Sequence, residues 1–329
     1  MTKEALFYED ADGDKRVRCT LCPHECTIKD GSRGVCGIRE NRSGKLLALT
    51  YGRIASVQMD PIEKKPLYHM SPGSQILSLG SVGCNLACAF CQNWSLVTAD
   101  VPHSYTSPED VSELAKRHGS TGIAYTYNEP LIWYEYILDS GKVNKENNLF
   151  NVLVTNGFIN KKPLEKLLPI IDAMNIDLKS IHDSFYRKNC RGRLEPVKET
   201  IRLASSSALV EVTCLIIPGE NDSDDDIKTL SDFIAGVNPD IPLHLSRYFP
   251  HRSFTAPPTP TSTMLKAYDI ARERLNYVYL GNLVTDVGSN SYCPNCNALL
   301  VERSGYRTKV HSLSKDICIK CNTKLNFIG

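Results

Sequence analysis

The sequence has almost no net charge and no long hydrophobic segment. Its 329 residues include 38 lysines and arginines and 37 aspartates and glutamates, a formal net charge of +1. This balance gives no electrostatic reason to expect nucleic acid or an anionic membrane as a partner. No apolar run approaches the roughly 18 residues of a transmembrane helix. The charged N-terminal stretch MTKEALFYEDADGDKR lacks the apolar centre of a signal peptide, so we expect a cytoplasmic protein.

Cysteine is abundant, but its distribution does not fit a disulfide framework. Thirteen cysteines are many for a reducing compartment, in which disulfides do not persist. Cys190 and Cys214 stand alone, and the other eleven fall into three groups. Groups of four, three and four cysteines are typical of metal sites. The groups are Cys19, Cys22, Cys26 and Cys36, then Cys84, Cys88 and Cys91, and finally Cys293, Cys296, Cys318 and Cys321.

The middle group, Cys84 to Cys91, has the spacing C-x3-C-x2-C and follows the apolar run Ile76–Val82. Such a run predicts a buried strand, which puts the cysteines in a loop at its carboxyl end. A 4Fe–4S cluster normally takes four thiolates, so three would leave one iron open to a cofactor or substrate. The motif resembles that of the radical S-adenosylmethionine (SAM) enzymes, a likeness which implies that the open iron binds SAM. The alternatives are a structural metal knuckle or unligated thiols.

The first group lies in an N-terminal region, residues 1–75, and reads C-x2-C-x3-C-x9-C. Four thiolates, with His24 as a substitute ligand, could hold zinc or a second iron–sulfur cluster. We favour zinc, because the spacing is unlike that of ferredoxins. Partly free cysteines in a loop-rich cap are the alternative.

The last group forms two C-x2-C knuckles about twenty residues apart within residues 289–329. This spacing predicts a zinc ribbon, with rubredoxin-like iron as the competitor. Asn297 and Asn322 follow the knuckles, and asparagine tolerates the left-handed backbone that such a turn needs. The module has few apolar residues, so the metal would supply much of its stability.

Strand and helix patterns alternate through the central region, residues 76–288, which is typical of a parallel sheet. Ser107 and Ser223 are expected to cap two of the helices. About six βα units fit an open, partial (β/α)6-type barrel better than a closed eight-fold one. The expected strands are Ile76–Val82, Gly122–Tyr127, Asn151–Thr155, Ala173–Leu178, Leu209–Ile217 and Leu243–Tyr248, with Tyr277–Leu280 as a further candidate.

Polar residues recur where these strands end. Glu129, in the stretch TYNEP, could pair with the ammonium group of SAM. Asp177 and Lys179 share one face of their strand and could bind hydroxyl and carboxylate groups, although a structural ion pair is an equal alternative. The candidate cofactor-binding residues are Asn128, Glu129, Asn156, Asp177, Lys179 and His244, the last of which could equally be a core histidine.

A more specific resemblance covers nearly the whole chain. The motifs are KKPLYHMSPGS, GCNLACAFCQNW, TYNEP, VTNGF, IDLKS, FYRKNCRGRLEPV, LIIPGEND and HLSRYFP. They resemble the radical SAM enzymes of the AmmeMemoRadiSam system, which are related to pyruvate formate-lyase activating enzymes. By this likeness TYNEP stands for the GGEP element of radical SAM enzymes, although Tyr127 and Asn128 replace its glycines. The likeness also makes Asp177, Lys179 and His244 residues of the cofactor pocket.

The resemblance implies cleavage of SAM by one electron from an external ferredoxin-type or flavodoxin-type donor. The resulting 5′-deoxyadenosyl radical would take hydrogen from a substrate that no motif identifies. The substrate could be a protein, as for an activase that makes a glycyl radical. It could also be a small molecule or nucleoside in a system with Memo-type and AMMECR-type partners. A non-catalytic iron–sulfur or zinc scaffold is the third alternative.

Cys190 lies in the basic stretch RKNCRGR. Flanking cations would lower the pKa of a loop thiol and make it reactive, unless the cysteine is incidental to the loop. Cys214 is expected to be a small core residue.

Overall fold

One open sheet of eight strands organises the computed structural model, which describes residues 2–11, 13–98, 102–285 and 287–329. Seven strands are parallel, and the edge strand β8 (Ser56–Pro61) is antiparallel to its neighbour. The order is β16-β15-β14-β13-β12-β11-β9-β8, so the two edges do not pair within the described chain. The parallel strands are β9 (Gln75–Gly80), β11 (Gly122–Tyr125), β12 (Phe150–Thr155), β13 (Ala173–Asp177), β14 (Leu209–Ile216), β15 (Leu243–Arg247) and β16 (Val278–Gly281).

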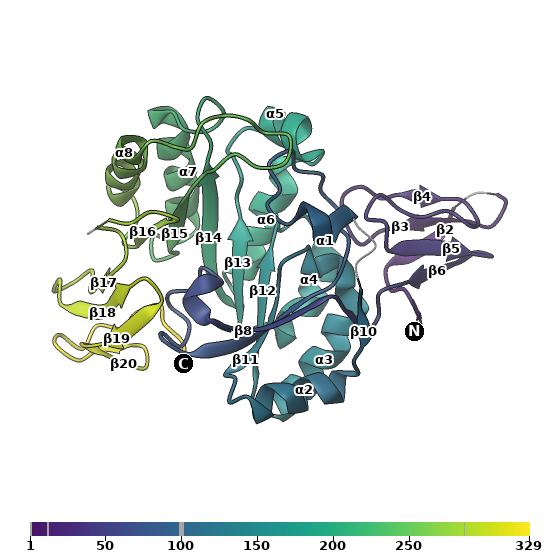
Figure 1. The fold of residues 1–329 in the computed structure, drawn as a ribbon, viewed down its shortest axis with the longest axis horizontal. Helices are drawn as coiled ribbons and strands as arrows, with labels where there is room; N and C mark the ends of the chain where they lie inside the picture. Colours follow the sequence, from purple (N-terminus) through teal and green to yellow (C-terminus); the bar gives the residue numbers. More distant parts are fainter. Residues whose placement is uncertain (1, 12, 99–101, 286) are drawn as a thin grey trace.

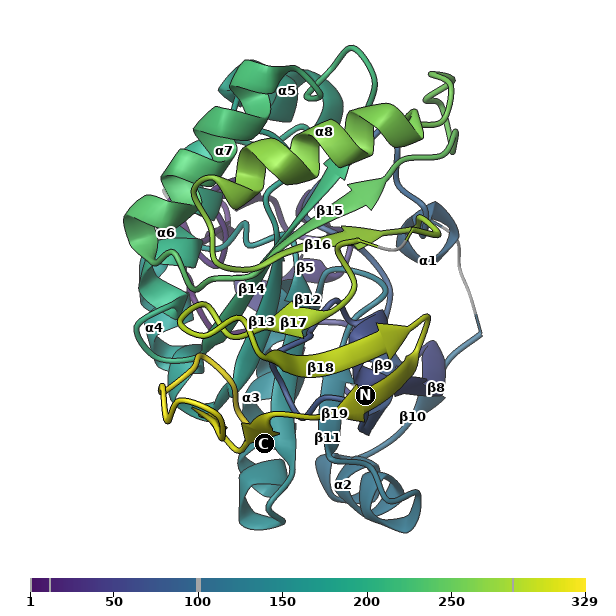
Figure 2. The ribbon, with the colours of Figure 1, turned by 90° about the vertical axis from the view of Figure 1, so that its left-hand side faces the viewer.

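This architecture confirms the expected partial barrel, and Figure 1 shows its strands with helices beside them. The connecting helices cover the outer face of the sheet, and α6, α7 and α8 lie along it in Figure 2. Their apolar faces pack on the strands in one large core. The longer helices are α2 (Pro108–Arg117), α3 (Tyr134–Glu146), α4 (Lys161–Leu167), α6 (Leu194–Ala204), α7 (Asp224–Val237) and α8 (Thr261–Arg272). The shorter ones are α1 (Trp94–Thr98), α5 (Asp183–Phe185), three 3-10 turns at Ile62–Lys64, Pro130–Trp133 and Leu168–Ile170, and a π-helical turn, Tyr186–Cys190.

Two helices begin where the sequence predicts. The Ser107 side chain accepts from the backbone of Asp110, and the Asp110 side chain accepts in return, which is a capping box. Ser223 and Asp226 form the same arrangement at α7. Each box satisfies backbone N–H groups that a helix start leaves unpaired. These helix starts in turn fix where the loops above the strands begin.

The N-terminal cap consists of two small antiparallel sheets at one side of the barrel (Figure 1). Strand β8 lies within residues 1–75, the expected N-terminal region. It nevertheless belongs to the barrel sheet, because it pairs with β9 over its whole length. A buried ion pair joins the cap to the barrel, because Arg39 binds both oxygens of Glu135 on α3 at 2.7 and 2.8 Å. The cap strands are β1 (Lys3–Glu4), β6 (Lys45–Ala48) and β5 (Arg39–Arg42), and β2 (Tyr8–Ala11), β3 (Arg16–Cys19) and β4 (Thr27–Ile28). A two-stranded ladder pairs β7 (Arg53–Ile54) with β10 (Ser104–Tyr105).

The C-terminal module lies on the other side of the barrel and packs on the segment that leads into β9 (Figure 1). Phe327 stacks on His69 with ring centroids 3.8 Å apart, and Ile328 donates its N–H to the His69 carbonyl. Arg303 is buried over the Tyr68 ring and donates to the Tyr68 carbonyl at 2.6 Å. The module is therefore part of the barrel wall. Its strands are β17 (Ser291–Tyr292), β18 (Leu299–Ser304), β19 (Arg307–Val310), β20 (Leu313–Ser314) and β21 (Ile317–Cys318).

None of the helices in the described residues is both long enough and apolar enough to cross a membrane.

The Arg39–Glu135 pair predicts a large loss of stability when one partner is removed. Glu135→Ala leaves a buried guanidinium without its carboxylate, which costs about 3–5 kcal/mol. We expect a clear fall in the urea midpoint of the full-length protein. The control is Glu9→Ala, which breaks the exposed cap pair between Glu9 and Arg18 and should cost less than about 1 kcal/mol. Equal effects of the two variants would show that the buried pair does not hold the cap.

Candidate metallocofactor site

The cysteines of the middle group lie in a loop directly after β9, at the carboxyl edge of the parallel strands. Cys84, Cys88 and Cys91 are all half-buried, and their thiols are not in disulfides. Burial raises the pKa of Cys84 well above its usual range and raises that of Cys91. Thiols in such surroundings become thiolates when a metal binds them. The loop is thus placed where α/β barrels carry their chemistry.

Asparagine side chains hold the backbone of this loop at its entry. Asn128 donates from Nδ2 to the carbonyls of Val82 and Gly83, both at 3.1 Å, and accepts from the Ser81 N–H at 3.0 Å. Asn85 is almost fully buried and donates to the Phe158 carbonyl at 2.7 Å. The side chain of Asn128 therefore positions the cysteine loop, and its cofactor-binding role stays a prediction.

The far part of the loop is held by two other segments. Ala87 and Ala89 donate their N–H groups to the carbonyls of Cys190 and Asn189 in the π-helical turn. Arg252 donates to the Cys88 carbonyl at 2.6 Å. These contacts fix the backbone around Cys88 from the barrel side and from the 251–253 loop.

Cys190 is fully buried, and its thiol hydrogen-bonds with Cys88. That contact and burial raise the pKa of Cys190 far above its ordinary value. The prediction of a reactive loop thiol is therefore wrong, because the flanking basic residues point elsewhere and the sulfur faces the cluster loop. Cys214 is buried in the core, as expected.

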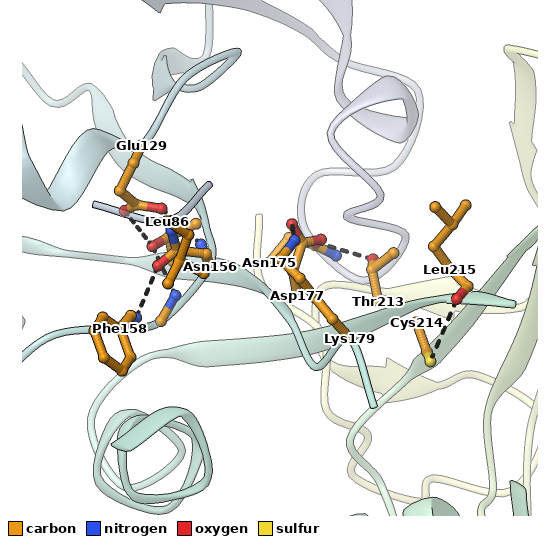
Figure 3. A network of polar contacts seen from close by, with 12 residues as sticks. Leu86, Glu129, Asn156, Phe158, Asn175, Asp177, Lys179, Thr213, Cys214 and Leu215 are labelled. Atoms are coloured by element: carbon orange, nitrogen blue, oxygen red, sulfur yellow. Dashed lines mark hydrogen bonds and ion pairs between the residues drawn. The ribbon is translucent and has the colours of Figure 1, made fainter. Parts of the chain in front are cut away.

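Glu129 is buried beside the loop (Figure 3) and forms no ion pair with any residue that the structure describes. Its carboxylate accepts from the Thr155 hydroxyl at 2.6 Å and from the N–H groups of Leu131 and Asn156 at 2.9 and 2.8 Å. Burial outweighs these donors and raises the pKa of Glu129 to about 7. A carboxylate in this position is ready to pair with an ammonium group.

Asn156 links the carboxylate to the cysteine loop. Its N–H binds Glu129, and its Nδ2 lies 2.9 Å from Asn85 Oδ1 and 3.6 Å from Cys84 Sγ. The Asn156 carbonyl oxygen Oδ1 accepts from Phe158. One residue therefore connects the ends of β9, β11 and β12, through its backbone N–H and its side-chain amide.

Asp177 and Lys179 form an ion pair at 2.7 Å at the end of β13 (Figure 3). Burial works against the charge of Lys179, but Asp177 and the nearby thiols of Cys88 and Cys190 outweigh it and raise its pKa. The pair supplies one anionic and one cationic group next to the cysteine loop. The structural ion pair is therefore present, and the cofactor-binding role of the two residues stays a prediction.

His244 lies lower in the barrel, in a buried network. Its Nε2 is 2.6 Å from Glu211, whose other contacts are the N–H groups of Tyr68 and His69. The His244 ring also packs edge-on against Tyr68. Its role in the cofactor pocket stays a prediction, and the structure shows a histidine that is bonded within the core.

The four cap cysteines line a single cavity with His24 and Arg39. The cavity is small, with about 10 Å³ open to the centre of a water-sized sphere. Burial raises the pKa values of Cys19 and Cys36 and raises that of Cys22 to about 12. The structure brings these cysteines together, which fits a metal site in the cap.

The ribbon cysteines are arranged as a compact tetrad. Cys293 and Cys321 are 3.6 Å apart at sulfur, and Cys296 and Cys318 are 3.7 Å apart. All four sulfurs lie within 4.8 Å of one another. A tetrahedral zinc site with bonds of about 2.3 Å needs spacings of this size. The positive φ angles of Asn297 (57°) and Asn322 (59°) confirm the predicted knuckle turns.

The donor sets fit the cofactors that the sequence suggests. Three thiols at a strand end, a buried acid with no ion-pair partner among the described residues, and an ion pair beside them suit a thiolate-bound cluster with an ammonium-bearing ligand. The fold and these side chains define a partial (β/α) barrel protein whose sheet carries, at its carboxyl edge, a set of residues suited to a metallocofactor.

Comparison with known proteins identifies the family. The model of the radical SAM superfamily matches residues 79–233, which include the cysteine loop and Glu129. The chain is 45% identical to an uncharacterized protein of Methanocaldococcus jannaschii over 99% of both chains. It belongs to the radical SAM superfamily.

More distant relatives agree with this assignment. The pyruvate formate-lyase 1-activating enzyme of Escherichia coli is 23% identical over 46% of this chain and 65% of that enzyme. Among solved structures, TYW1 with a lysine-pyruvate adduct bound has a TM-score of 0.50 at 17% identity. That match covers 70% of this chain and 89% of the other, and it shows the shared fold.

Sequence reasoning missed the residues that hold the loop. Neither Asn85, which ties the loop to Phe158, nor Thr155, which binds Glu129, was named as a site residue, although the place of Asn85 between two cysteines of the motif is a usable signal. Cys190 was named, but as a reactive thiol and not for its contact with Cys88. Cys190 is the last residue of the π-helical turn, which ends at Arg191 in a left-handed backbone conformation (φ 55°). No local pattern indicates that turn.

The pKa of Glu129 predicts an unusual pH dependence of stability. The folded protein holds a proton on Glu129 up to about pH 7, whereas the ordinary pKa is 4.5. Within this window the folded state binds more protons, so its stability falls by about 1.4 kcal/mol per pH unit as the pH rises. Above pH 7 the loss is complete. We expect Glu129→Gln to remove this slope in urea titrations at pH 5, 6, 7 and 8.

The control for this measurement is Glu113→Gln, which changes an exposed carboxylate on α2. It should keep the wild-type slope between pH 5 and 7. If Glu129→Gln and the wild type show the same pH profile, the carboxyl group is not desolvated in solution.

The ribbon predicts a separate metal dependence. Cys318→Ala should remove one zinc per chain and lower the stability of the module, because a metal held by the four cysteines would add to the small apolar cluster of Leu300, Val301 and Phe327. We expect zinc analysis to show the loss and limited proteolysis to cut within residues 291–328. Cys296→Ala tests the same site with less disturbance of the packing, because Cys296 is exposed. Full zinc retention in both variants would refute the ribbon site.

Proposed function

We propose that this protein cleaves SAM with a 4Fe–4S cluster held by Cys84, Cys88 and Cys91. When bound, the cluster supplies one electron for cleavage to methionine and a 5′-deoxyadenosyl radical, which takes hydrogen from a substrate. The observation that carries the proposal is the buried carboxylate of Glu129, which lies beside a three-cysteine loop and has no ion-pair partner among the described residues.

The protein residues would bind and orient the cofactor. Glu129 would accept the ammonium group of SAM, and the donors from Thr155 and Asn156 keep its carboxylate aimed at the loop. Asp177 and Lys179 would bind hydroxyl and carboxylate groups, each by giving up part of their mutual contact. Cys190 would donate its S–H to the Cys88 sulfur, which stabilises the thiolate.

Apolar side chains would keep water from the site. Leu86 and Phe90 lie within the cysteine loop and are almost fully buried. Phe90 packs against Phe185 and Phe254, with ring centroids 5.8 and 5.9 Å apart. A dry pocket strengthens the electrostatic contacts inside it and protects a reactive radical from solvent.

A protein is the substrate class that we favour, with the enzyme acting as an activase. The support is the similarity to pyruvate formate-lyase activating enzymes, which extends over about half of this chain. The electron donor would be an external ferredoxin-type or flavodoxin-type protein. We also propose partners of the Memo and AMMECR types, which only the sequence motifs support. A cytoplasmic location is likewise part of the proposal and rests on the sequence alone.

Cys88→Ala tests the proposed function. After anaerobic reconstitution with iron and sulfide, the wild type should give an electron paramagnetic resonance (EPR) signal that shifts with SAM and should form 5′-deoxyadenosine. The variant should lose both, because one iron loses its thiolate, while its ribbon zinc remains. Cys214→Ala, which changes a buried core thiol, should keep both properties. Formation of 5′-deoxyadenosine by Cys88→Ala would overturn the assignment.

A further inference from the structure

We propose that Cys19, Cys22, Cys26 and Cys36 bind a second iron–sulfur cluster, which passes single electrons to the cysteine loop of the barrel. The role of this cluster rests on the proposed function, since the electron has its use at the SAM site. The metal assignment itself is independent of that function. This assignment of a cluster replaces the zinc that we favoured from the sequence spacing of the cap cysteines.

The first argument is the spacing of the sulfurs. A single tetrahedral zinc ion holds its thiolates roughly 4 Å apart, as the ribbon does at 3.6 and 3.7 Å. Within the described residues, only the ribbon offers three or more ligand atoms that all lie within 4.8 Å. In the cap and in the Cys84 group, by contrast, no three sulfurs all lie within 4.8 Å of one another. In a cluster each thiolate binds its own iron, which requires this wider spacing.

The second argument is the lining of the cap cavity. Apart from the thiols, its walls are mostly apolar, with Leu21, Ile28 and Ile132 among them. Arg39 also lines the cavity and is 2% exposed. Its Nη atoms bind Glu135 and the Leu6 carbonyl, but its buried Nε has no hydrogen-bond partner in the described protein. A cluster sulfur would accept this N–H, and hydrogen bonds to sulfur tune cluster potentials.

The third argument is the contact between the two cysteine sites. The His24 Nε2 atom lies 2.6 Å from the Asn85 carbonyl, one residue after Cys84. On the other side of Cys84, the Cys36 carbonyl packs against Gly83 so closely that a Cβ there would come within 2.7 Å of it. Gly83 also has a φ of 84°. The cap site therefore touches the backbone on both sides of a catalytic cysteine.

The cap site also lies close to the surface. Val35 precedes Cys36, lines the same cavity and is 65% exposed. An external donor of the ferredoxin or flavodoxin class can approach there. The donor would lose one electron and the cap cluster would gain it. The cap cluster would return to its oxidised state when that electron moves on to the Cys84 loop.

Metal analysis of three full-length proteins tests the cluster. They are the wild type, a barrel variant with Cys84→Ala, Cys88→Ala and Cys91→Ala, and a cap variant with Cys22→Ala and Cys36→Ala. After anaerobic reconstitution we expect about eight irons and one zinc in the wild type, and about four irons in the barrel variant. The reduced barrel variant should give a cluster EPR signal that does not respond to SAM. A barrel variant with no iron and a second zinc would overturn the proposal.

Electron transfer tests the role. In rapid mixing with reduced flavodoxin, the SAM-responsive cluster of the cap variant should be reduced at least tenfold more slowly than that of the wild type. The barrel variant should still accept one electron at the wild-type rate, and it provides the test if the cap variant fails to fold. If a cap variant that still holds its ribbon zinc shows the same rate of cluster reduction as the wild type, the relay is refuted. Failure of the wild type to respond to SAM would instead refute the proposed function.

Discussion

The hydrogen bonds that hold the loop of Cys84, Cys88 and Cys91 are the constraint on which the rest of the structure depends. Three thiols can share one cofactor only if the backbone between them is fixed, and a loop has no secondary structure to fix it. Here Asn128 and Arg252 supply bonds from two other parts of the chain, and Asn85 within the loop binds the Phe158 carbonyl. The barrel strands, the turn at Cys190 and the cap thus serve to hold a loop of eight residues.

The three cysteine groups show that similar sequence spacing does not lead to similar positions of the sulfur atoms. The ribbon and the cap both contain a C-x2-C pair, and both offer four thiols. Only in the ribbon do tight turns at Asn297 and Asn322 bring all four sulfurs around one point. The cap instead spreads its thiols over a strand, a turn and a loop around an apolar cavity. Backbone conformation therefore decides which group suits a single ion.

Much of the fold could be predicted from the sequence, because apolar runs and capping residues are local signals. Ser107 and Ser223 cap helices as expected, and each predicted strand forms within two residues of its expected end. The site was less predictable. The role of Asn128 as a support for the loop and the contact of Cys190 with Cys88 depend on residues more than 40 positions apart. Such contacts arise from tertiary packing, which leaves no periodic pattern in the chain.

The docking of the C-terminal module has a consequence for biosynthesis. Phe327 and Ile328 complete the surroundings of His69, and Arg303 fills the space over Tyr68, although more than 230 residues separate each pair. A ribosome makes the barrel strands before it makes these partners, so a nascent chain exposes the apolar surface of His69 and Tyr68 until the end. A metal bound by the knuckle cysteines, as proposed, would also have to be acquired before the module is complete. Metal supply can thus set the pace at which a newly made chain becomes a finished barrel.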